Sequence, residues 1–492
     1  MLSFRLLTNM FTLFFHLLFL FFISNNFVFG DETSASSEGL SPEEDTSQWE
    51  FKTPHGKLSN TFNVFGQRVR GFSTTHNRLD VEVEGGFSLT TPSQKTFTTK
   101  FTPWVWGQVP HAVGGLSRKN RVFFELKEGW VEYASSTFDI RVGNQILSWG
   151  AADKVNPTDV WNPIDYTDLF QSHKLPILAI VSSIHPAELE KVSLELILTP
   201  VFKESRIPLV FPKTGSVPLA LSSSRWLLAL PSSALSSGIR IPLNYELSTP
   251  TYPATWQAGG RFKLMGYQGW DFSLSGYNGV EKIPRIFLTR RGNATDPNLP
   301  VTITLNPSFH REMMLGLDGE GDIPESDIGL RFEVAYRMRD NSRLKNESEQ
   351  VKADLEKDDY FHGVLGGDYT SKGKIFGTVL YTNIMYVLLY KLPKQEKVVG
   401  VNTLTGVPAV DPWDRNLVMY IENRFSSDMK LGTTFISSQK NWDFYLNPVF
   451  HFQVSDAFHT SLGGEVFFGP SSGFFGQYRD NRRAVFSASY EL

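Results

Sequence analysis

Segments of about ten residues in which polar and apolar side chains alternate recur along most of this chain of 492 residues. In residues 327–338 every second side chain is apolar, and Arg331, Glu333 and Arg337 lie between them. Successive side chains of a β-strand point to opposite faces, so this period of two predicts strands. A wholly apolar face opposite a face with both signs of charge is typical of a strand that separates lipid from a water-filled lumen.

The N-terminal residues predict that the protein is exported. Arg5 precedes an apolar run over residues 10–23, and small or apolar residues at 28–30 precede an acidic segment. This pattern is typical of a secretory signal peptide over residues 1–30, with a retained membrane anchor as the alternative. After Gly30 there is no run of about 18 apolar residues, so if the mature protein lies in a membrane it must cross with strands.

Composition excludes several other classes of protein. The chain has no cysteine, which excludes disulfides, a lipoprotein anchor and a thiolate site. Removal of residues 1–30 takes away only Arg5, so 47 − 1 = 46 basic residues stand against 51 acidic ones, and this balance is not that of a nucleic-acid-binding protein. Residues 31–56 are rich in acids and serine, and we expect them to form a disordered lead-in.

The strand pattern predicts one all-β domain over residues 57–492, a transmembrane antiparallel β-barrel of about 18 strands within a range of about 14 to 18. Long connections follow the odd-numbered strands, whereas tight turns such as residues 266–269 follow the even-numbered ones. This parity favours a barrel with short periplasmic turns and long extracellular or inward-folded loops. A soluble β-sandwich is the alternative, but it has no reason to separate its loop lengths in this way. The apolar face of residues 483–492 would close the barrel against the first strand.

Charged residues alternate with the apolar side chains of these strands and are expected to line the lumen. A barrel of about 16 to 18 strands is too wide to be filled by side chains alone, so it leaves an aqueous channel unless loops plug it. Two interpretations of the charges remain open: they pair across neighbouring strands and stiffen the wall, or they create a transverse field that orients a polar solute. The predicted pore-lining residues are Glu82, Arg141, Arg261, Lys263, Arg331, Glu333, Arg337 and Glu465.

Residues 148–175 form one of two connections that are too long to be simple turns. From Asp153 to Asp168 every third residue is Asp or Asn, and the sequence Asn-Pro-x-Asp occurs at 156–159 and again at 162–165. Proline fixes one backbone angle of a turn, and the Asn side chain accepts a hydrogen bond from the backbone two residues on. We therefore favour a rigid pair of turns that narrows the pore. The predicted constriction residues are Trp149, Asn156, Asp159, Asn162, Asp165 and Asp168.

Two other hypotheses for this loop remain open. Its carboxylate and amide oxygens are ligands that suit Ca²⁺, although their spacing differs from that of an EF-hand loop. Asp159 with Asp165 or Asp168 would be the acid pair of a glycosidase-like enzyme. The chain contains no G-x-S-x-G elbow, no H-E-x-x-H and no phosphate-binding loop, so we expect no enzyme activity, no metal and no cofactor.

The second long connection, residues 203–253, contains an unusually apolar stretch at 217–230. Such a stretch is not typical of a loop that is exposed to water. We expect it to plug or cap the barrel. The alternatives are that it lies against the membrane surface or that it forms a site through which an apolar substrate enters.

Residues 141–170 resemble a broad family of porin-like bacterial outer-membrane β-barrel proteins, loosely related to the alginate-export-type porins. The shared features are a strand that ends in Gly-x-Gln-x-x-x-Trp-Gly, followed by Asn-Pro-x-Asp turns. Here the first motif comprises Gly143, Gln145, Trp149 and Gly150. Residues 194–202, 269–279 and 366–371 are also similar. The resemblance implies a porin-like barrel with a transport or cell-surface role, but neither a substrate nor catalytic residues.

The sequence thus predicts a porin-like channel for passive or gated passage of small solutes, in the outer membrane of a Gram-negative-type bacterium. The alternative is a plugged surface barrel that acts as an adhesin or as a structural protein. The expected partners are outer-membrane lipid, a small solute of unknown identity and, during insertion, the barrel-assembly machinery; no nucleic acid is expected. Whether the barrels form a homo-oligomer is left open.

Overall fold

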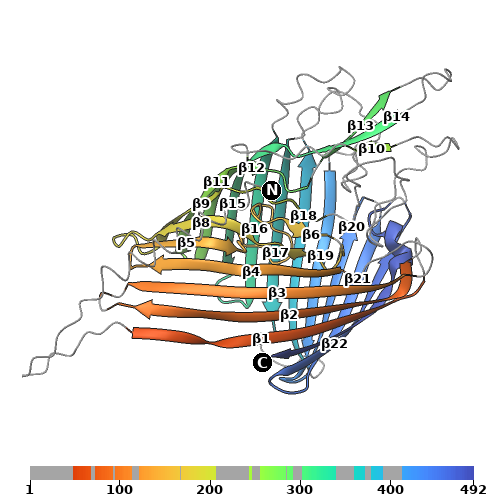
Figure 1. The fold of residues 1–492 in the computed structure, drawn as a ribbon, viewed down its shortest axis with the longest axis horizontal. Helices are drawn as coiled ribbons and strands as arrows, with labels where there is room; N and C mark the ends of the chain where they lie inside the picture. Colours follow the sequence, from red (N-terminus) through yellow and green to blue (C-terminus); the bar gives the residue numbers. More distant parts are fainter. Residues whose placement is uncertain are drawn as a thin grey trace, which may run out of the picture. The chain divides into compact units, whose positions relative to one another are not determined.

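The computed structural model of the protein contains a closed antiparallel barrel of 18 strands (Figure 1). The last strand pairs with the first, for example through Phe486 and Phe62, and this pairing closes the wall. The fold class predicted from alternation and loop lengths is therefore confirmed. The structure describes residues 48–67, 72–91, 93, 95–112, 121–166, 168–206, 243–245, 255–283, 285–291, 302–339, 359–371, 378–391, 413–440, 442–471 and 473–491.

The barrel strands follow one another around the wall in chain order. The first half comprises β1 (Gln48–Phe65), β2 (Phe72–Thr90), β3 (Thr96–Ala112), β4 (Arg121–Ala134), β5 (Phe138–Gln145), β8 (Ile177–Ile184), β9 (Val192–Thr199), β11 (Gln257–Tyr267) and β12 (Trp270–Val280). The second half comprises β15 (Arg311–Asp322), β16 (Ile328–Arg339), β17 (Tyr360–Thr370), β18 (Val379–Lys391), β19 (Trp413–Arg424), β20 (Met429–Ser438), β21 (Asp443–Gln453), β22 (Phe458–Phe468) and β23 (Arg483–Glu491).

The two faces of the strands differ as the alternation predicted. On β16, Val334 is 41% exposed, whereas the adjacent Glu333 is fully buried inside the barrel. Leu365 on β17 and Leu462 on β22 are likewise among the exposed large apolar side chains. An outer wall of this kind would cost free energy in water and is stable in the hydrocarbon core of a bilayer.

The first strand begins earlier than the sequence suggested. β1 starts at Gln48, so residues 48–56, which we had placed in the acidic lead-in, belong to the barrel wall. Trp49 and Phe51 pair with Leu89 and Phe87 of β2, and the register shifts between Lys52 and His55. This bulge reverses the alternation and conceals the strand in the sequence. The predicted signal peptide, residues 1–30, and the rest of the lead-in lie outside the described residues.

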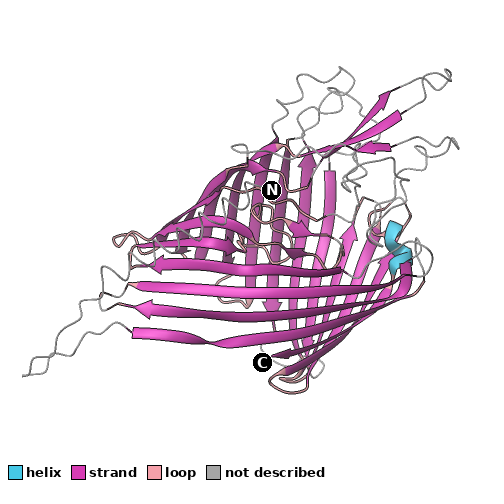
Figure 2. Cartoon of the chain, viewed as in Figure 1, coloured by secondary structure: helices cyan, strands magenta, loops and turns pink. Residues whose placement is uncertain are grey.

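Short connections join β11 to β12 and β21 to β22, while the long connections lie at the opposite ends of the strands. Two of the long connections carry β10 (Leu243–Tyr245), β13 (Arg285–Arg291) and β14 (Thr302–Ser308), which form a separate small sheet. Figure 2 shows that most of the described chain forms strands. The helical element drawn among the described residues is the 3-10 helix Gly476–Asn481. Most of connection 203–253, including its apolar stretch, lies outside the described residues.

Among the residues that the structure describes, no helix combines the length and apolar character needed to cross a membrane.

Candidate functional site: a loop folded into the barrel

The connection from β5 to β8 turns inward, and the side chain of Asn162 joins its two ends. Asn162 Oδ1 accepts a hydrogen bond from the backbone nitrogen of Leu147 at 2.8 Å. Its Nδ2 donates to the carbonyl oxygens of Leu175 at 2.8 Å and Gln145 at 3.3 Å. The side chain therefore spans the base of the loop. The sequence predicted a local turn at 162–165. This prediction is wrong, because the side-chain amide of Asn162 binds groups that are distant in the sequence.

A tryptophan pair packs the base of the loop against the wall. Trp161 is completely buried and lies edge-on to Trp149 at 5.3 Å and to Tyr277 of β12 at 4.9 Å. The indole nitrogen of Trp149 donates to Glu195 of β9 at 2.6 Å. The surrounding core cluster also includes residues of β8, β15 and β16. This packing, together with the Asn162 hydrogen bonds, fixes the base of the loop.

The first arm of the loop, residues 150–160, binds the carboxylate of Glu333 on β16. That carboxylate accepts hydrogen bonds from the backbone nitrogen of Thr158 at 2.6 Å and from those of Ala151 and Ala152 at 3.2 and 3.3 Å. Gly150 has φ +97°, and a Cβ there would lie 2.4 Å from Glu333 Oε2. The glycine is therefore required both by its backbone angle and by the close approach of the carboxylate.

Two arginines of β16 flank this carboxylate and hold the same arm. Arg331 forms an ion pair with Asp153, whose carboxylate also accepts from Asn383 of β18 at 2.7 Å. Arg337 donates to the carbonyl oxygen of Pro157 at 2.8 Å. Ala152 belongs to a buried apolar cluster whose other members lie on the wall, namely Val364, Met385, Val387 and Val418. The arm is thus docked on β16 to β19 by both charge and packing.

The first Asn-Pro-x-Asp sequence does form a turn. The backbone nitrogen of Asp159 donates to the carbonyl oxygen of Asn156 at 3.1 Å, while the Asn156 side chain donates to the carbonyl of Trp149 at 3.2 Å. Asp159 forms an ion pair with Lys174, which also donates to the Leu147 carbonyl at 2.8 Å. Burial raises the pKa of Asp159 more than Lys174 lowers it.

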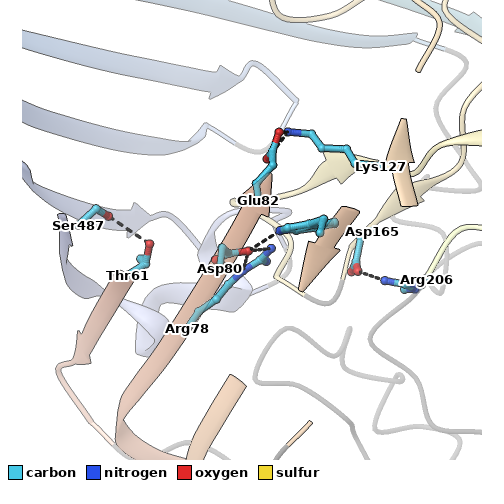
Figure 3. Close-up of polar contacts among 9 residues, drawn as sticks. Thr61, Arg78, Asp80, Glu82, Lys127, Asp165, Arg206 and Ser487 are labelled. Carbon is cyan, nitrogen blue, oxygen red and sulfur yellow. Dashed lines mark hydrogen bonds and ion pairs between the residues drawn. The ribbon is translucent and has the colours of Figure 1, made fainter. Parts of the chain in front are cut away.

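The second arm runs from residue 164 to 174 and approaches β3 and β4. Its short strands β6 (Ile164–Asp165) and β7 (His173–Lys174) pair with each other. Asp165 binds Arg206 at 3.1 Å, and Arg206 also contacts Glu125 of β4. The ring of His173 lies edge-on to Trp104 of β3 at 5.3 Å. Figure 3 shows the Asp165–Arg206 pair, and in the same view Arg78 bound to Asp80 of β2.

The tip of the second arm reaches the C-terminal strands. Asp168 binds Arg483 of β23 at 2.5 and 3.0 Å, and the same guanidinium binds Glu465 of β22. The ring of Phe170 lies 4.6 Å from that of Phe467 and 4.8 Å from that of Tyr445. The loop therefore contacts the wall on three sides: around β3 to β12, at β16 to β19, and at β21 to β23.

Most of the predicted pore-lining residues form ion pairs with a residue on the next strand or on the strand beyond it. Three of these pairs are Arg141–Glu132 at 2.6 Å, Arg261–Asp318 at 2.9 Å and Glu82–Lys127 at 2.7 Å. Lys263 lies half-buried on β11. Such pairs favour the first of our two interpretations, that the charges stiffen the wall. Whether these side chains also contact a solute stays a prediction.

The Asp and Asn side chains of the loop are spread over separate partners rather than gathered around one point. Asp153, Asp165 and Asp168 each face a different arginine, on β16, after β9 and on β23. In the described part of the chain, no group of three His, Asp or Glu residues is arranged to hold a metal ion. The repeat in the sequence is thus a series of anchors, and the three-residue spacing does not bring the oxygens together.

Several residues that hold the loop were missed in the sequence, chiefly Lys174, Arg206 and Arg483. Arg483 is the one basic residue within 483–492, and it stands on the inner face of its strand. A basic residue at an inward position was the available signal, but it does not indicate its partner. The partner lies 315 residues away in the sequence.

Comparison with known proteins gives no family. No family model matches the chain, and no curated protein matches it. Solved structures that are similar include Pseudomonas aeruginosa OpdK with vanillate, with 9% identity, a TM-score of 0.48 and coverage of 89% of this chain and 98% of that one. Others are Acinetobacter baumannii OccAB1, with 9% identity, a TM-score of 0.46 and coverage of 91% and 96%, and the Vibrio cholerae outer membrane protein OmpT lacking loop L8, with 10% identity, a TM-score of 0.38 and coverage of 91% and 100%.

Proposed function

We propose that this protein is an outer-membrane channel for small solutes, and that loop 148–175 sets the width of its pore. The observation that carries the proposal is the docking of one loop on three sides of an 18-stranded wall. A closed barrel of this strand number encloses more space than its own side chains fill. A loop anchored from inside is the part of the molecule that decides how much of that space a solute can use.

The charges on the wall support a passage for polar rather than apolar solutes. The inner face carries both signs, with Lys127 and Glu82 on one side of the barrel and Arg331 and Asp368 on another. These pairs remain partly exposed within the barrel, so water and a hydrated solute can reach them. An apolar solute would gain little from such a wall.

Conductance measurements in planar lipid bilayers test the channel. The wild-type protein should insert with discrete conductance steps. A variant in which residues 151–160 are replaced by a short glycine-serine linker should show larger steps, because the arm on Glu333 is then missing. The control is Ser455→Gly in the exposed turn between β21 and β22, which should conduct like the wild type.

The two forms together separate the channel from a plugged barrel. A silent wild type with a conducting loop variant would identify a barrel that the loop seals, as an adhesin or a structural protein would need. Silence of both forms in correctly folded protein would refute the channel.

A further inference from the structure

Arg483 joins three parts of the barrel that are far apart in the sequence. Its side chain is completely buried, and its guanidinium binds Asp168 of the loop at 2.5 and 3.0 Å. It also binds Glu465 of β22 at 2.7 and 2.9 Å. On its other side it stacks on the ring of Phe65 of β1 at 5.5 Å. One cation thus touches the loop tip, the neighbouring strand and the first strand.

These contacts lie at the seam where the barrel closes. Arg483 is the first residue of β23 and pairs with Phe65 in the ladder between the last strand and the first. It pairs with Glu465 in the ladder between β22 and β23. A shift of β23 by one residue would turn the side chain toward lipid, because successive side chains of a strand alternate between faces. The guanidinium therefore reaches Asp168 only when both ladders are in register.

Asp168 also holds the backbone of the loop tip in place. Besides binding Arg483, its Oδ1 accepts hydrogen bonds from the backbone nitrogens of Phe170 at 3.2 Å and Gln171 at 3.3 Å. This local turn directs the Phe170 ring into a cluster of aromatic side chains on the wall, which includes Phe467 and Tyr445. Both the ion pair with Arg483 and the apolar packing of Phe170 thus depend on the carboxylate of Asp168.

We propose that Arg483 is the positioning residue of the constriction, and that it couples the placement of loop 148–175 to correct closure of the barrel. The inference rests on the proposed channel function only in that it calls the loop a constriction. Without the guanidinium, the half-buried carboxylate of Asp168 and the buried one of Glu465 would have no cation between them, and they would repel. The loop tip then leaves the wall, while its base stays fixed by Asn162 and Trp161.

Distances between spin labels test this coupling without reference to transport. The chain has no cysteine, so labels can be attached to Ser172→Cys in the loop tip and Ser455→Cys in the turn after β21, both exposed positions. The wild-type background should give one narrow distance distribution. Arg483→Met and Asp168→Asn should lose the narrow peak. Arg483→Lys should retain part of it, because lysine keeps the charge but lacks the two-pronged guanidinium.

A label pair within the wall provides the matched control. Ser426→Cys and Ser455→Cys lie in two short turns, and their distance should be unchanged in every variant that folds. Asp168→Asn leaves the buried Arg483–Glu465 pair intact, so it reports on the loop even if Arg483→Met does not insert into the membrane. A narrow tip distance that persists in Asp168→Asn would overturn the proposal.

Conductance of the same variants separates this inference from the channel. A mobile tip should produce noisy, fluctuating current steps in Asp168→Asn where the wild type gives steady ones. If the tip distance broadens but neither form conducts, the positioning role of Arg483 stands and the channel function fails. If the channel conducts and the distance stays narrow, the channel stands and the positioning role fails.

Discussion

Thr158 donates two hydrogen bonds to one carboxylate oxygen of Glu333, from its backbone nitrogen at 2.6 Å and from its hydroxyl at 2.8 Å. Ala151 and Ala152 donate to the other oxygen of the same group. The loop backbone thus encloses an anion that belongs to the wall. The strength of this arrangement comes from charge-assisted hydrogen bonds in a site without bulk water.

Glu333→Gln should therefore destabilise the barrel and loosen the first arm. The amide keeps one acceptor oxygen but directs its NH₂ group at donors of the loop, which costs on the order of 1 to 3 kcal/mol. Urea unfolding in lipid vesicles measures this loss. The control is Glu320→Gln on β15, whose side chain is half-exposed, and its stability should match the wild type. Equal stability of both variants would contradict the role of Glu333.

Gly150→Ala should displace the same arm by a different route. Its Cβ would meet both carboxylate oxygens of Glu333, and its φ of +97° disfavours any side chain, so we expect a loss on the order of 1 to 3 kcal/mol. The free energy of unfolding and the conductance should both change. Gly464→Ala is the control, because a Cβ at Gly464 meets nothing within 4 Å. A conductance like that of the wild type would show that the arm tolerates the shift.

Asp159→Asn and Asp168→Asn should differ in their effect on the free energy of unfolding at neutral pH. Burial raises the pKa of Asp159 above 3.8, so the folded protein binds this proton more readily, and its charge lowers stability at neutral pH. Asn removes that charge, and we expect no loss of stability. Burial alone would also raise the pKa of Asp168, but Arg483 outweighs it and the pKa is lowered.

The ion pair of Asp168 should therefore stabilise the fold at every pH above about 4 and lose its effect as the pH falls further. Asp168→Asn should cost on the order of 3 kcal/mol at pH 7, because it removes one of the two carboxylates that neutralise the buried Arg483. Unfolding curves of both variants at pH 7 and pH 3 test this contrast. Equal losses for Asp159→Asn and Asp168→Asn at pH 7 would be inconsistent with it.

Lys282 lies just after β12 and should make the free energy of unfolding increase with pH. Its amine donates to Gln257 and to the Tyr277 hydroxyl at 3.2 Å, and burial lowers its pKa from 10.5 to about 7. Between these two values the unfolded chain binds more protons than the folded one, so stability increases as the pH rises from 7 toward 10.5. Lys282→Met should abolish this increase. Lys191→Met, in an exposed turn, should keep it.

The architecture could be predicted from local sequence because each strand carries its own signal. The alternation in 327–338 reappears as β16, Ile328–Arg339, with apolar side chains outside and charged ones inside. Lipid and lumen impose opposite preferences on neighbouring residues, and this requirement acts on every strand separately. The prediction of strands from alternation failed at residues 48–56, where the bulge between Lys52 and His55 reverses the alternation.

The sequence by itself determined that the chain forms a barrel and that residues 148–175 are exceptional, because alternation, loop length and an Asn-Pro repeat are local properties. Only the tertiary structure decided what the repeat does. Thr158 meets Glu333 175 residues further on, and Asp168 meets Arg483 315 residues further on. Those partners are selected by strand register and barrel closure, which bring distant inner faces together around one loop. The spacing of residues along the chain therefore does not predict such contacts.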